Sequence, residues 1–478
     1  MIATTSDAGQ LGSGLEVFDR YAGLSLPRHV SYPMPNWWHA MDEADALRMH
    51  AASAEHRPEQ DLSLYLHLPF CEKLCKFCGC NKVILPKHQD GAAERVAGYL
   101  AALTREIRLL AEKTDSARPL RQIHWGGGSP SYLDVGQIER IHDAIGTAFA
   151  IADDAEIAME VDPRGVTPDK LAGLRRMGFN RVSMGIQDFD GQVQAHVRRI
   201  QPFEMVEQVV ACCRELGFDS VNFDLIYGMP YQTMETIRHT LEQTILLAPD
   251  RIAYYHYAQI PEKIATQRGM DYTRLPDSRT KLRMFLLAQE MFEGAGYEFI
   301  GLDHFARPDD PLAKSHKDGT LQRNFQGMTT GGDLRLLAAG VSGITHLPGV
   351  GFLQNIKTTD GYVERVSRGV LPVDRGKSLT RDDGIRQAVL AQLYCQGFVI
   401  ARDVEEAFGI AFGDYFAREL AGLEVLERDG LVTVNSVGDI RLTAPLGYVL
   451  MRNVAAVFDA YLDPEAYLKG DGCYSANA

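Results

Sequence analysis

Four cysteines lie close together in one short stretch of the chain, at Cys71, Cys75, Cys78 and Cys80. Cysteine thiolates bind zinc and iron–sulfur clusters. The CxxxCxxC spacing of the first three can hold three corners of a cubane cluster and leave the fourth iron open to another ligand. Structural zinc, with Cys80 as the fourth ligand, is the alternative, but such sites usually draw paired ligands from two separated segments. None of the other cysteines is paired at CxxC spacing, so the pattern favours an iron–sulfur cluster.

The remaining cysteines are scattered along the chain and are expected to be ordinary thiols: Cys212, Cys213, Cys395 and Cys473. Residues 1–20 contain no basic segment followed by an apolar one, which argues against a secretory signal. No apolar run approaches the roughly 18 residues of a membrane span. We therefore expect a cytoplasmic protein, in which thiols stay reduced and clustered cysteines bind metal rather than form disulfides.

A second group of candidate residues follows two predicted strands. Gly126, Gly127 and Gly128 precede Ser129 directly after a strand predicted at 122–125, and backbone without side chains can approach a ligand closely. Their spacing differs from GxGxxG, so no dinucleotide-binding fold is predicted. Glu160 stands near the end of the next predicted strand, where it could bind a ligand or form an ordinary salt bridge.

Short β-rich runs that alternate with helix-like stretches must position these residues. The helix-like stretches include 98–112 and 168–177, and a strand followed by a helix about every 30 residues is the βαβ pattern. The pattern predicts an α/β fold with a parallel sheet and outer helices. About six repeats predict an open or partial (β/α)6 barrel, with its chemistry at the carboxyl ends of the strands. The predicted strands cover 63–70, 122–125, 156–161, 181–187, 220–227, 251–258 and 297–304.

Length and charge restrict the domain organisation and the partners. The chain has 478 residues and a formal net charge of −14 at pH 7, with 49 Lys and Arg against 63 Asp and Glu. Proteins that bind nucleic acid or anionic membranes broadly carry the opposite excess, so neither partner is expected. We expect three parts: an irregular N-terminal wrapping segment over 1–60, the barrel over 61–375 and a smaller, mostly helical domain over 376–478.

The C-terminal part has the element order of a winged helix. A helix predicted at 380–397 begins with Asp382 and Asp383, which suit the positive end of the helix dipole, and two shorter helices and a hairpin at 431–443 follow. This order would fit DNA binding. Residues 381–460, however, carry seven Arg and no Lys against twelve Asp and Glu, a net charge of −5, whereas a wing that reads a DNA groove is basic. A lid or packing domain over the barrel mouth is the preferred interpretation.

The cysteine motif resembles that of the radical S-adenosylmethionine (SAM) enzymes, in which CxxxCxxC with an aromatic residue before the last Cys follows the first strand of a βα repeat. The resemblance implies that Cys71, Cys75 and Cys78 hold one [4Fe–4S] cluster, with Phe77 and Cys80 beside it but not as ligands. It also implies that SAM binds the open iron through its amino and carboxylate groups. One electron then cleaves SAM to a 5′-deoxyadenosyl radical.

Further segments extend the resemblance, over about residues 18–462, to the oxygen-independent coproporphyrinogen III oxidase family of radical SAM enzymes. They read YLHLPFCEKLCKFCGCNK, HWGGGSPSYL, MEVDPRG, GFNRVSMGIQDF, NFDLIYGMP, GLDHFARPDD and RNFQGMTT. This family oxidatively decarboxylates two propionates of coproporphyrinogen III to vinyl groups, giving protoporphyrinogen IX in haem biosynthesis. The resemblance implies that the radical abstracts hydrogen from a propionate β-carbon, carbon dioxide leaves, and one electron passes to an acceptor.

By the same resemblance, ten residues of this chain match positions that contact SAM, and some of them surround a second SAM molecule. The positions around the first SAM are matched by Tyr65, Gly127, Gly128, Ser129, Glu160 and Ile344. The positions around the second are matched by Gln187, Arg199, Asp224 and Ala258. Without the resemblance, an isolated Ile or Ala would be interpreted as a core residue.

The implied substrate carries four carboxylates, so its pocket needs cations. Arginine suits bidentate capture of a carboxylate. Arg28, Arg307 and Arg323 lie in family-like segments and are candidate substrate ligands, although each could equally be a surface or ion-pair arginine. The implied partners also include an unidentified electron donor and acceptor. No coiled-coil heptads occur, and a monomer is expected.

Two positions depart from the family pattern. His29-Val30 stand where the pattern has Tyr-Thr, and Met328 stands where it has Tyr. A thioether lacks the hydrogen-bond donor and the redox chemistry of a phenol, so the departures concern substrate identity and efficiency. Two alternatives stay open: a diverged radical SAM enzyme that acts on another tetrapyrrole by methyl transfer or haem ring opening, and a haem-binding or trafficking protein.

Overall fold

A thirteen-stranded sheet lies at the centre of the computed structural model, which describes residues 8–462. Neighbouring strands from β14 through β2, β5, β6, β7 and β8 to β9 are parallel, so their carboxyl ends meet at one edge. This arrangement confirms the predicted partial barrel. The parallel strands are β2 (Leu62–Leu68), β5 (Leu120–Gly127), β6 (Ile151–Val161), β7 (Arg181–Gln187), β8 (Ser220–Tyr227), β9 (Arg251–His256) and β14 (Arg335–Ala339).

Six of the seven predicted strands match this set. The predictions at 181–187 and 220–227 coincide with β7 and β8, and the other four overlap β2, β5, β6 and β9. β2 is buried at six of its seven positions, as expected for a parallel strand that is covered on both faces.

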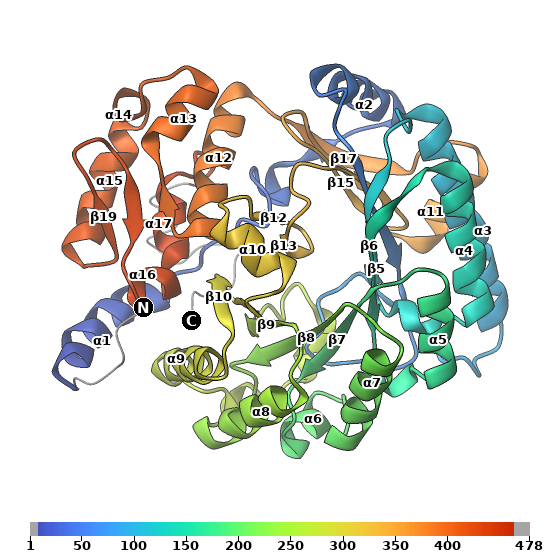
Figure 1. Cartoon of the computed structure of the whole chain (residues 1–478), viewed down its shortest axis with the longest axis horizontal. Coiled ribbons are helices and arrows are strands. Elements are labelled where there is room, and N and C mark those ends of the chain that lie inside the picture. The colour runs from blue at the N-terminus through green and yellow to red at the C-terminus, as the bar shows by residue number, and fades with distance from the viewer. Residues whose placement is uncertain (1–7, 463–478) are drawn as a thin grey trace.

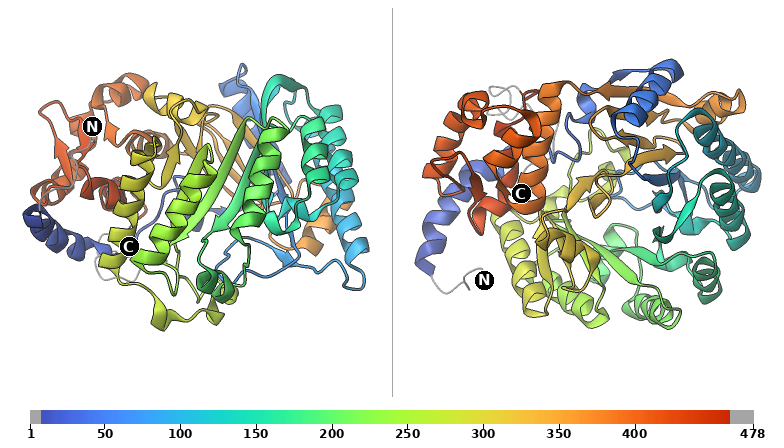
Figure 2. Two further views of the ribbon diagram at one scale, coloured as in Figure 1. Left: turned by 60° about the horizontal axis from the view of Figure 1, so that its bottom comes forward. Right: turned by 45° about the horizontal axis from the view of Figure 1, so that its top comes forward.

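Helices cover the outer face of the sheet (Figures 1 and 2). Several begin at a side chain that accepts a hydrogen bond from the first helical turn, as Asp134, Thr167 and Thr233 do. Within residues 8–462, none of the helices combines the length and apolarity that crossing a bilayer requires. The outer helices are α3 (Ala92–Lys113), α4 (Val135–Ala148), α5 (Pro168–Arg176), α6 (Gly191–His196), α7 (Phe203–Glu215), α8 (Met234–Leu247) and α9 (Ser278–Gly294), and the predicted helices overlap α3 and α5.

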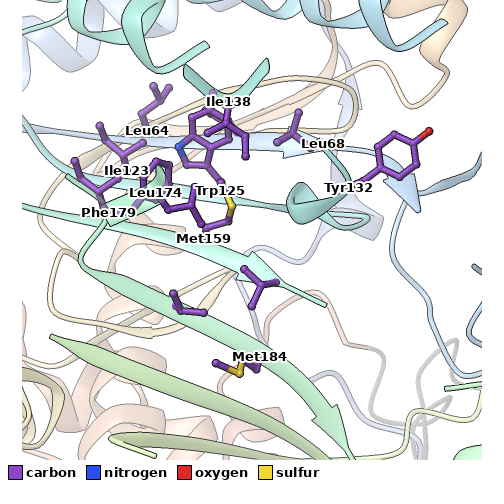
Figure 3. Close-up of a cluster of buried hydrophobic side chains, with 14 of the residues drawn as sticks. Leu64, Leu68, Ile123, Trp125, Tyr132, Ile138, Met159, Leu174, Phe179 and Met184 are labelled. Atoms are coloured by element: carbon purple, nitrogen blue, oxygen red, sulfur yellow. The ribbon is translucent and has the colours of Figure 1, made fainter. Parts of the chain in front are cut away.

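Apolar side chains between the sheet and its helices form the main core (Figure 3). The fully buried indole of Trp125 lies with its ring centroid 5.6 Å from that of Phe179. Leu64, Ile123 and Met159 extend the same cluster across β2, β5 and β6. Close packing of this kind fixes the strands relative to one another, and it therefore fixes the carboxyl ends that carry the candidate residues.

Antiparallel strands extend the sheet on both sides. β11 (His304–Ala306) pairs with β9, and β10 (Glu298–Gly301) pairs with β11. The prediction of one strand at 297–304 is wrong, because positive φ angles at Gly301 (113°) and Leu302 (51°) turn the chain there. On the other side the sheet adds β15 (Ile344–Leu347), β16 (Gly351–Asn355), β17 (Val373–Ser378) and β1 (His39–Ala40). Outside the main sheet lie β3 (Phe70–Cys71), β4 (Val83–Ile84), α10 (Pro311–Lys317), β12 (Gln322–Asn324), β13 (Gly327–Thr329) and α11 (Thr359–Ser367).

The N-terminal segment contains two regular helices, so the expectation of an irregular segment over 1–60 is wrong for them. They are α1 (Ala8–Ala22) and α2 (Glu43–His56). Phe18 and Ala22 belong to a second hydrophobic cluster, most of which comes from the C-terminal part. Met49 of α2 belongs instead to the core of the barrel. The segment is therefore held by both parts of the molecule.

The C-terminal part begins with α12 (Arg381–Gln396), which coincides with the predicted helix. Thr380 and Asp383 form a reciprocal capping box at its start, and Gly397 ends it with a φ of 74°. A three-stranded sheet completes the predicted hairpin (Figure 1, orange to red). Its elements are β18 (Phe398–Val399), α13 (Ala401–Phe408), α14 (Phe412–Tyr415), α15 (Ala417–Arg428), β19 (Val432–Val434), β20 (Ile440–Leu442), α16 (Leu446–Val449) and α17 (Met451–Val457). Cys473 lies outside the described residues.

Candidate active site

A cavity of about 520 Å³ opens at the carboxyl ends of the parallel strands. This volume is in the range of small-molecule and cofactor sites. The fold brings most of the sequence-predicted residues to its walls, although they are far apart in the chain. The predicted residues that line it are Cys71, Cys75, Phe77, Cys78, Cys80, Gly127, Gly128, Ser129, Glu160, Gln187, Arg199 and Asp224.

Hydrogen bonds hold the cysteine loop from more than one side. Cys71 ends β3, which pairs with β4. The Lys76 N–H donates to the carbonyl of Val197 over 3.0 Å, and the Gln267 amide donates to the carbonyl of Phe77 over 3.0 Å. All the described cysteines are free thiols. The loop is therefore positioned by the surrounding chain, without disulfides.

Positive charge lies beside two of the thiols. The Nη1 atom of Arg199 lies 3.5 Å from the Sγ of Cys75. A hydrogen bond from the Cys80 thiol outweighs burial and, with the positive charge of Lys82, lowers the pKa of Cys78 to about 6. Neighbouring cations and donors favour the thiolate, which is the form that binds metal.

The third thiol is more shielded, because burial and the neighbouring Cys78 and Cys75 raise the pKa of Cys71 to about 12. Among residues 8–462, no group of three or more His, Cys, Asp or Glu side chains is spaced to share a single metal ion. The thiolates around a cubane bind different irons, so they lie farther apart than the ligands of one zinc ion. The CxxxCxxC spacing, without a second pair of cysteines at CxxC spacing elsewhere in the sequence, favours a cluster over zinc.

Neighbouring segments leave no room for a side chain at Gly127, which ends β5, or at Gly128, which follows it. Gly127 has a φ of 115°, and a Cβ atom there would lie 2.9 Å from the imidazole of His67. A Cβ atom on Gly128 would lie 2.4 Å from the carbonyl oxygen of Pro69. The sequence predicted these glycines for the close approach of a ligand. In the structure they also let β5 lie against the segment that leads into the cysteine loop.

Glu160 faces the cavity from the end of β6. Its Oε1 lies 3.1 Å from the Nε2 of His124, so the carboxylate also has a hydrogen-bond partner within the protein. The ring of Tyr65 stacks on His124 with centroids 6.0 Å apart, and its hydroxyl lies 3.1 Å from the Nδ1 of His67. The Glu160 side chain keeps 42% of its surface exposed, which leaves the carboxylate open to a ligand in the cavity.

Gln187 and Arg199 meet beside the backbone of Gly185. Arg199 donates to the Gly185 carbonyl from Nε over 2.9 Å and from Nη2 over 2.6 Å. A Cβ atom on Gly185 would lie 2.6 Å from the amide nitrogen of Gln187. On the neighbouring β8, burial and the negative charge of Glu160 raise the pKa of Asp224 to about 6. This side of the cavity therefore presents an arginine, an amide and a carboxyl group together.

Three of the ten predicted SAM contacts lie outside the cavity lining: Tyr65, Ala258 and Ile344. The carbonyl of Ala258 accepts a hydrogen bond of 2.9 Å from Gln267, the residue that also binds the cysteine loop. Ile344 begins β15, which β14 separates from β2. Ala258 is thus linked to the cysteine loop through one side chain, whereas Ile344 lies on the second strand from β2.

Known proteins resemble this chain over nearly its whole length. The radical SAM superfamily matches residues 65–244. The oxygen-independent coproporphyrinogen III oxidase of Synechocystis sp. is 42% identical over 94% of this chain and 95% of its own, and that of Escherichia coli is 41% identical over 96% and 98%. The solved structure of coproporphyrinogen III oxidase (HemN) from Escherichia coli, described as a radical SAM enzyme, covers 92% of this chain and 100% of its own at 41% identity, with a TM-score of 0.85. The chain belongs to the oxygen-independent coproporphyrinogen III oxidase family.

Membership of this oxidase family implies a [4Fe–4S] cluster and SAM, and it removes the zinc alternative. The prediction of a radical SAM fold, made from the CxxxCxxC loop and the βα pattern, is confirmed. The cysteine loop and the glycine segment line the same cavity.

The three arginines predicted to bind the substrate of such an oxidase do not all lie at the same edge of the barrel. Arg28 forms an ion pair with Asp303, beside the carboxyl end of β9. The Cζ of Arg323 lies 5.7 Å from the ring centroid of Tyr394. The N–H of Arg307 donates to the carbonyl that directly precedes β9, so this arginine lies at the amino ends of the strands, away from the cavity.

The two departures from the oxidase pattern have buried surroundings. His29 places Nδ1 3.0 Å from the hydroxyl of Tyr394 and Nε2 3.0 Å from the carboxylate of Asp459. Met328 packs in a small apolar cluster that includes Leu321. Neither residue lines the cavity, so both departures change contacts around the site rather than its walls.

Two further residues, Asp162 and Arg164, line the cavity but were not predicted from the sequence. Arg164 donates to Asp162 over 2.6 Å and lies 3.6 Å from the Sγ of Cys75, while Arg199 lies 3.3 Å from Asp162. Although burial opposes ionisation, these two arginines hold the pKa of Asp162 at about 2. The sequence feature that could have identified Asp162 and Arg164 is Asp-Pro-Arg, directly after the strand that carries Glu160.

Proposed function

We propose that this protein is an oxygen-independent coproporphyrinogen III oxidase, which converts two propionates of coproporphyrinogen III to vinyl groups and yields protoporphyrinogen IX in haem biosynthesis. The observation that carries the proposal is the identity of 41% and 42% to oxidases of that name over more than nine tenths of both chains. The position of the cysteine loop on the wall of the cavity supports it, because the glycine segment, Glu160 and Arg199 line the same space.

Cys71, Cys75 and Cys78 would hold the cluster, with Phe77 and Cys80 beside it. When bound, the [4Fe–4S] cluster supplies the electron that cleaves SAM to a 5′-deoxyadenosyl radical. The guanidinium of Arg199 next to the Sγ of Cys75 would compensate part of the charge of the thiolates.

The first SAM would lie against the glycine segment. The backbone of Gly127 and Gly128 and the hydroxyl of Ser129 face the cavity, and the partly exposed carboxylate of Glu160 suits an amino group. Tyr65, which stacks behind Glu160 on His124, and Ile344 would add contacts from neighbouring strands.

A second SAM would lie beside Gln187, Arg199 and Asp224. These side chains offer both charges and an amide, which match the carboxylate and amino groups of an amino acid. Ala258 would contribute backbone near the same molecule. The measurement is the SAM stoichiometry of the reconstituted protein, with two molecules per chain expected for the wild type and one for Arg199→Ala. One molecule in both would contradict the second site.

We further propose that residues 1–60 and the domain over 376–478 close the mouth of the barrel domain over 61–375. The shared cluster of α1 and the C-terminal helices supports a joint cover. The net charge of −5 over residues 381–460 supports a packing role and argues against nucleic acid as a partner. We also propose a cytoplasmic monomer that uses an electron donor and acceptor still to be identified; light scattering on the eluting protein tests the oligomeric state.

An anaerobic assay with SAM, a reductant and coproporphyrinogen III tests the activity. The expected result is protoporphyrinogen IX, with two carbon dioxide molecules released per substrate. Methylated or ring-opened tetrapyrrole would instead show a diverged radical SAM enzyme. Haem binding without release of 5′-deoxyadenosine would show a trafficking protein, and either result would contradict the proposal.

A further inference from the structure

Four cationic side chains gather where the N-terminal segment, the barrel and the C-terminal domain meet. They come from separate parts of the chain: Arg28, Lys281 on α9, Arg323 on β12 and Arg452 on α17. Arg28, Lys281 and Arg452 line one small cavity, in which Asp303 is the one carboxylate among the residues that form its walls. Positive charge is therefore in excess at this junction.

Two of the cations lie over aromatic rings. The Cζ of Arg28 lies 5.8 Å from the ring centroid of Tyr255, and the same guanidinium pairs with Asp303. The Cζ of Arg323 lies 5.7 Å from the ring centroid of Tyr394, and its Nε and Nη1 atoms are buried without a hydrogen-bond partner. Buried donors of a charged group nearly always have an acceptor, so Arg323 is arranged for a partner that residues 8–462 do not supply.

Arg452 adds positive charge from the C-terminal domain. Its guanidinium is buried and donates to the carbonyl oxygens of Leu26 and Pro27. Burial and the positive charges of Arg28 and Arg323 lower its pKa to about 9. The fold thus keeps like charges close together, an arrangement that an anion bound between them would stabilise.

This cationic group adjoins the cavity of the active site. Asp224, which lines that cavity, pairs with Ala253 in the parallel β8–β9 ladder, so the side chain of Tyr255, two residues farther along β9, lies on the same face of the sheet. The turn of the β12–β13 hairpin closes over the hydroxyl of Tyr255, since a Cβ atom on Gly327 would lie 3.7 Å from it. A ligand that extends from the active site past Tyr255 would therefore reach the cations.

The space beside the cations is suited to a carboxylate rather than to a ring. The cavity lined by Arg28, Lys281 and Arg452 has a volume of about 40 Å³. About 10–15 Å³ of such a volume is enough for one water molecule, so the space holds a group of a few heavy atoms. Only a small anionic end group would fit, and the tetrapyrrole that carries it would remain on the active-site side.

We infer that Arg28, Arg323 and Arg452, with Lys281, bind the two propionate carboxylates that the reaction leaves intact. The inference rests on the proposed function, in which two of four propionates react. Because those two are consumed in turn, the substrate must be held through both steps by carboxylates that persist. Arginines fixed by the barrel, the N-terminal segment and the C-terminal domain would provide that anchor and couple domain closure to substrate binding.

Equilibrium binding of coproporphyrin III, the stable oxidised tetracarboxylate, tests this inference without turnover. Arg323→Gln removes a guanidinium whose buried Nε and Nη1 have no hydrogen-bond partner among the described residues, so the variant should fold normally. We expect its affinity for coproporphyrin III to fall by about tenfold or more, the scale of a lost charge-assisted hydrogen bond. Arg452→Gln should also lower the affinity for coproporphyrin III, and thermal unfolding checks that this variant is folded. The matched control is Arg402→Gln, whose side chain is 80% exposed on the C-terminal domain and should leave binding unchanged.

The tetramethyl ester of coproporphyrin III separates charge from shape. It should bind the wild type and Arg323→Gln equally. Equal affinity of both proteins for the free acid, or the same loss for acid and ester, would overturn the inference. Failure of the proposed function is a separate result: arginine-dependent porphyrin binding without vinyl product in the turnover assay would contradict the oxidase and leave the carboxylate site in place.

Discussion

The Nη1 atom of Arg199 lies 3.5 Å from the Sγ of Cys75, while the Nε and Nη2 atoms of the same guanidinium donate to the carbonyl of Gly185. One side chain thus joins the cysteine loop to β7. Its fork geometry matters as well as its charge, because two donors converge on one carbonyl while a third points to sulfur. The proposed cluster ligands and the proposed second SAM site are therefore linked through this residue.

The Arg199→Lys variant separates the effect of the positive charge from the effect of the fork geometry. Lysine keeps a positive charge near Cys75 but cannot donate to Gly185 and reach the sulfur at the same time. We expect reconstituted protein with about four irons per chain, as for the wild type, and SAM affinity reduced by about tenfold. Iron analysis and equilibrium dialysis with SAM give the two values. Equal loss of iron and SAM would show that only the cluster depends on this residue.

The ligand assignment predicts a pattern among the cysteines. Cys71→Ser, Cys75→Ser and Cys78→Ser should each abolish the cluster, because serine is a poor ligand for iron in this geometry. Cys80→Ser should retain about four irons per chain. Cys212→Ser, which changes a half-buried thiol on α7, is the control. Iron content after anaerobic reconstitution is the measurement, and loss of iron in Cys80→Ser alone would refute the assignment.

Much of the fold could be predicted from the sequence because the decisive signals were local. The bounds of β7 and β8 followed from short apolar runs between helices, and α12 followed from a helix-like stretch with Asp382 and Asp383 in its first turn. The β10–β11 turn could not be predicted, since Leu302 adopts a positive φ that its residue type disfavours. The helices of the N-terminal segment depend on distant partners, such as the C-terminal cluster around Phe18.

The site residues also divide into those with local sequence signals, which were predicted, and those that depend on distant contacts, which were not. The cysteines and glycines were found because they are close in sequence and unusual in composition. Asp162 and Arg164 were missed because an ion pair between neighbours looks ordinary until the fold places it against Cys75. Arg307 and Arg323 could not be told apart by sequence, and only the register of β11 against β9 puts Arg307 at the far edge of the barrel.

The glycine segment gives a third prediction. In Gly128→Ala the new Cβ atom would lie 2.4 Å from the carbonyl oxygen of Pro69, so the chain leading to Cys71 must move. We expect the reconstituted variant to lose more than half of its iron. Gly98→Ala is the control: it lies on the exposed face of α3 with nothing within 4 Å of its Cβ position. That change should keep the iron and stabilise the protein by up to about 1 kcal/mol. Full iron content in Gly128→Ala would show that the loop adapts.

An ion-pair network at the amino ends of the strands should make stability depend on pH. Burial disfavours the charge of Glu156, but Arg181 at 3.0 Å and Arg251 at 3.4 Å lower its pKa from 4.5 to about 2. A lowered pKa stabilises the fold above the unfolded value, and this contribution is lost as the pH falls from 4.5 towards 2.

Glu156→Gln isolates that contribution. At pH 7 the variant should be less stable than the wild type by about 3 kcal/mol, the value of the pKa shift. The difference should shrink between pH 5 and pH 3, because only the wild type then takes up a proton at this position. Urea unfolding at each pH measures both proteins. A difference that stays constant with pH would show that the amide changes packing rather than charge.

His29 joins the N-terminal segment to the C-terminal domain. It bridges the Tyr394 hydroxyl and the Asp459 carboxylate, both at 3.0 Å, inside the protein. His29→Ala should cost about 1–3 kcal/mol, because it leaves Asp459 buried without this partner. His29→Gln, which can still donate one hydrogen bond, should lose less. Thermal unfolding gives the order of stability, and limited proteolysis within residues 23–38 should be faster in His29→Ala if this bond holds the segment in place. Proteolysis at the wild-type rate would show that the segment is held mainly by other contacts, such as those of Arg452 with Leu26 and Pro27.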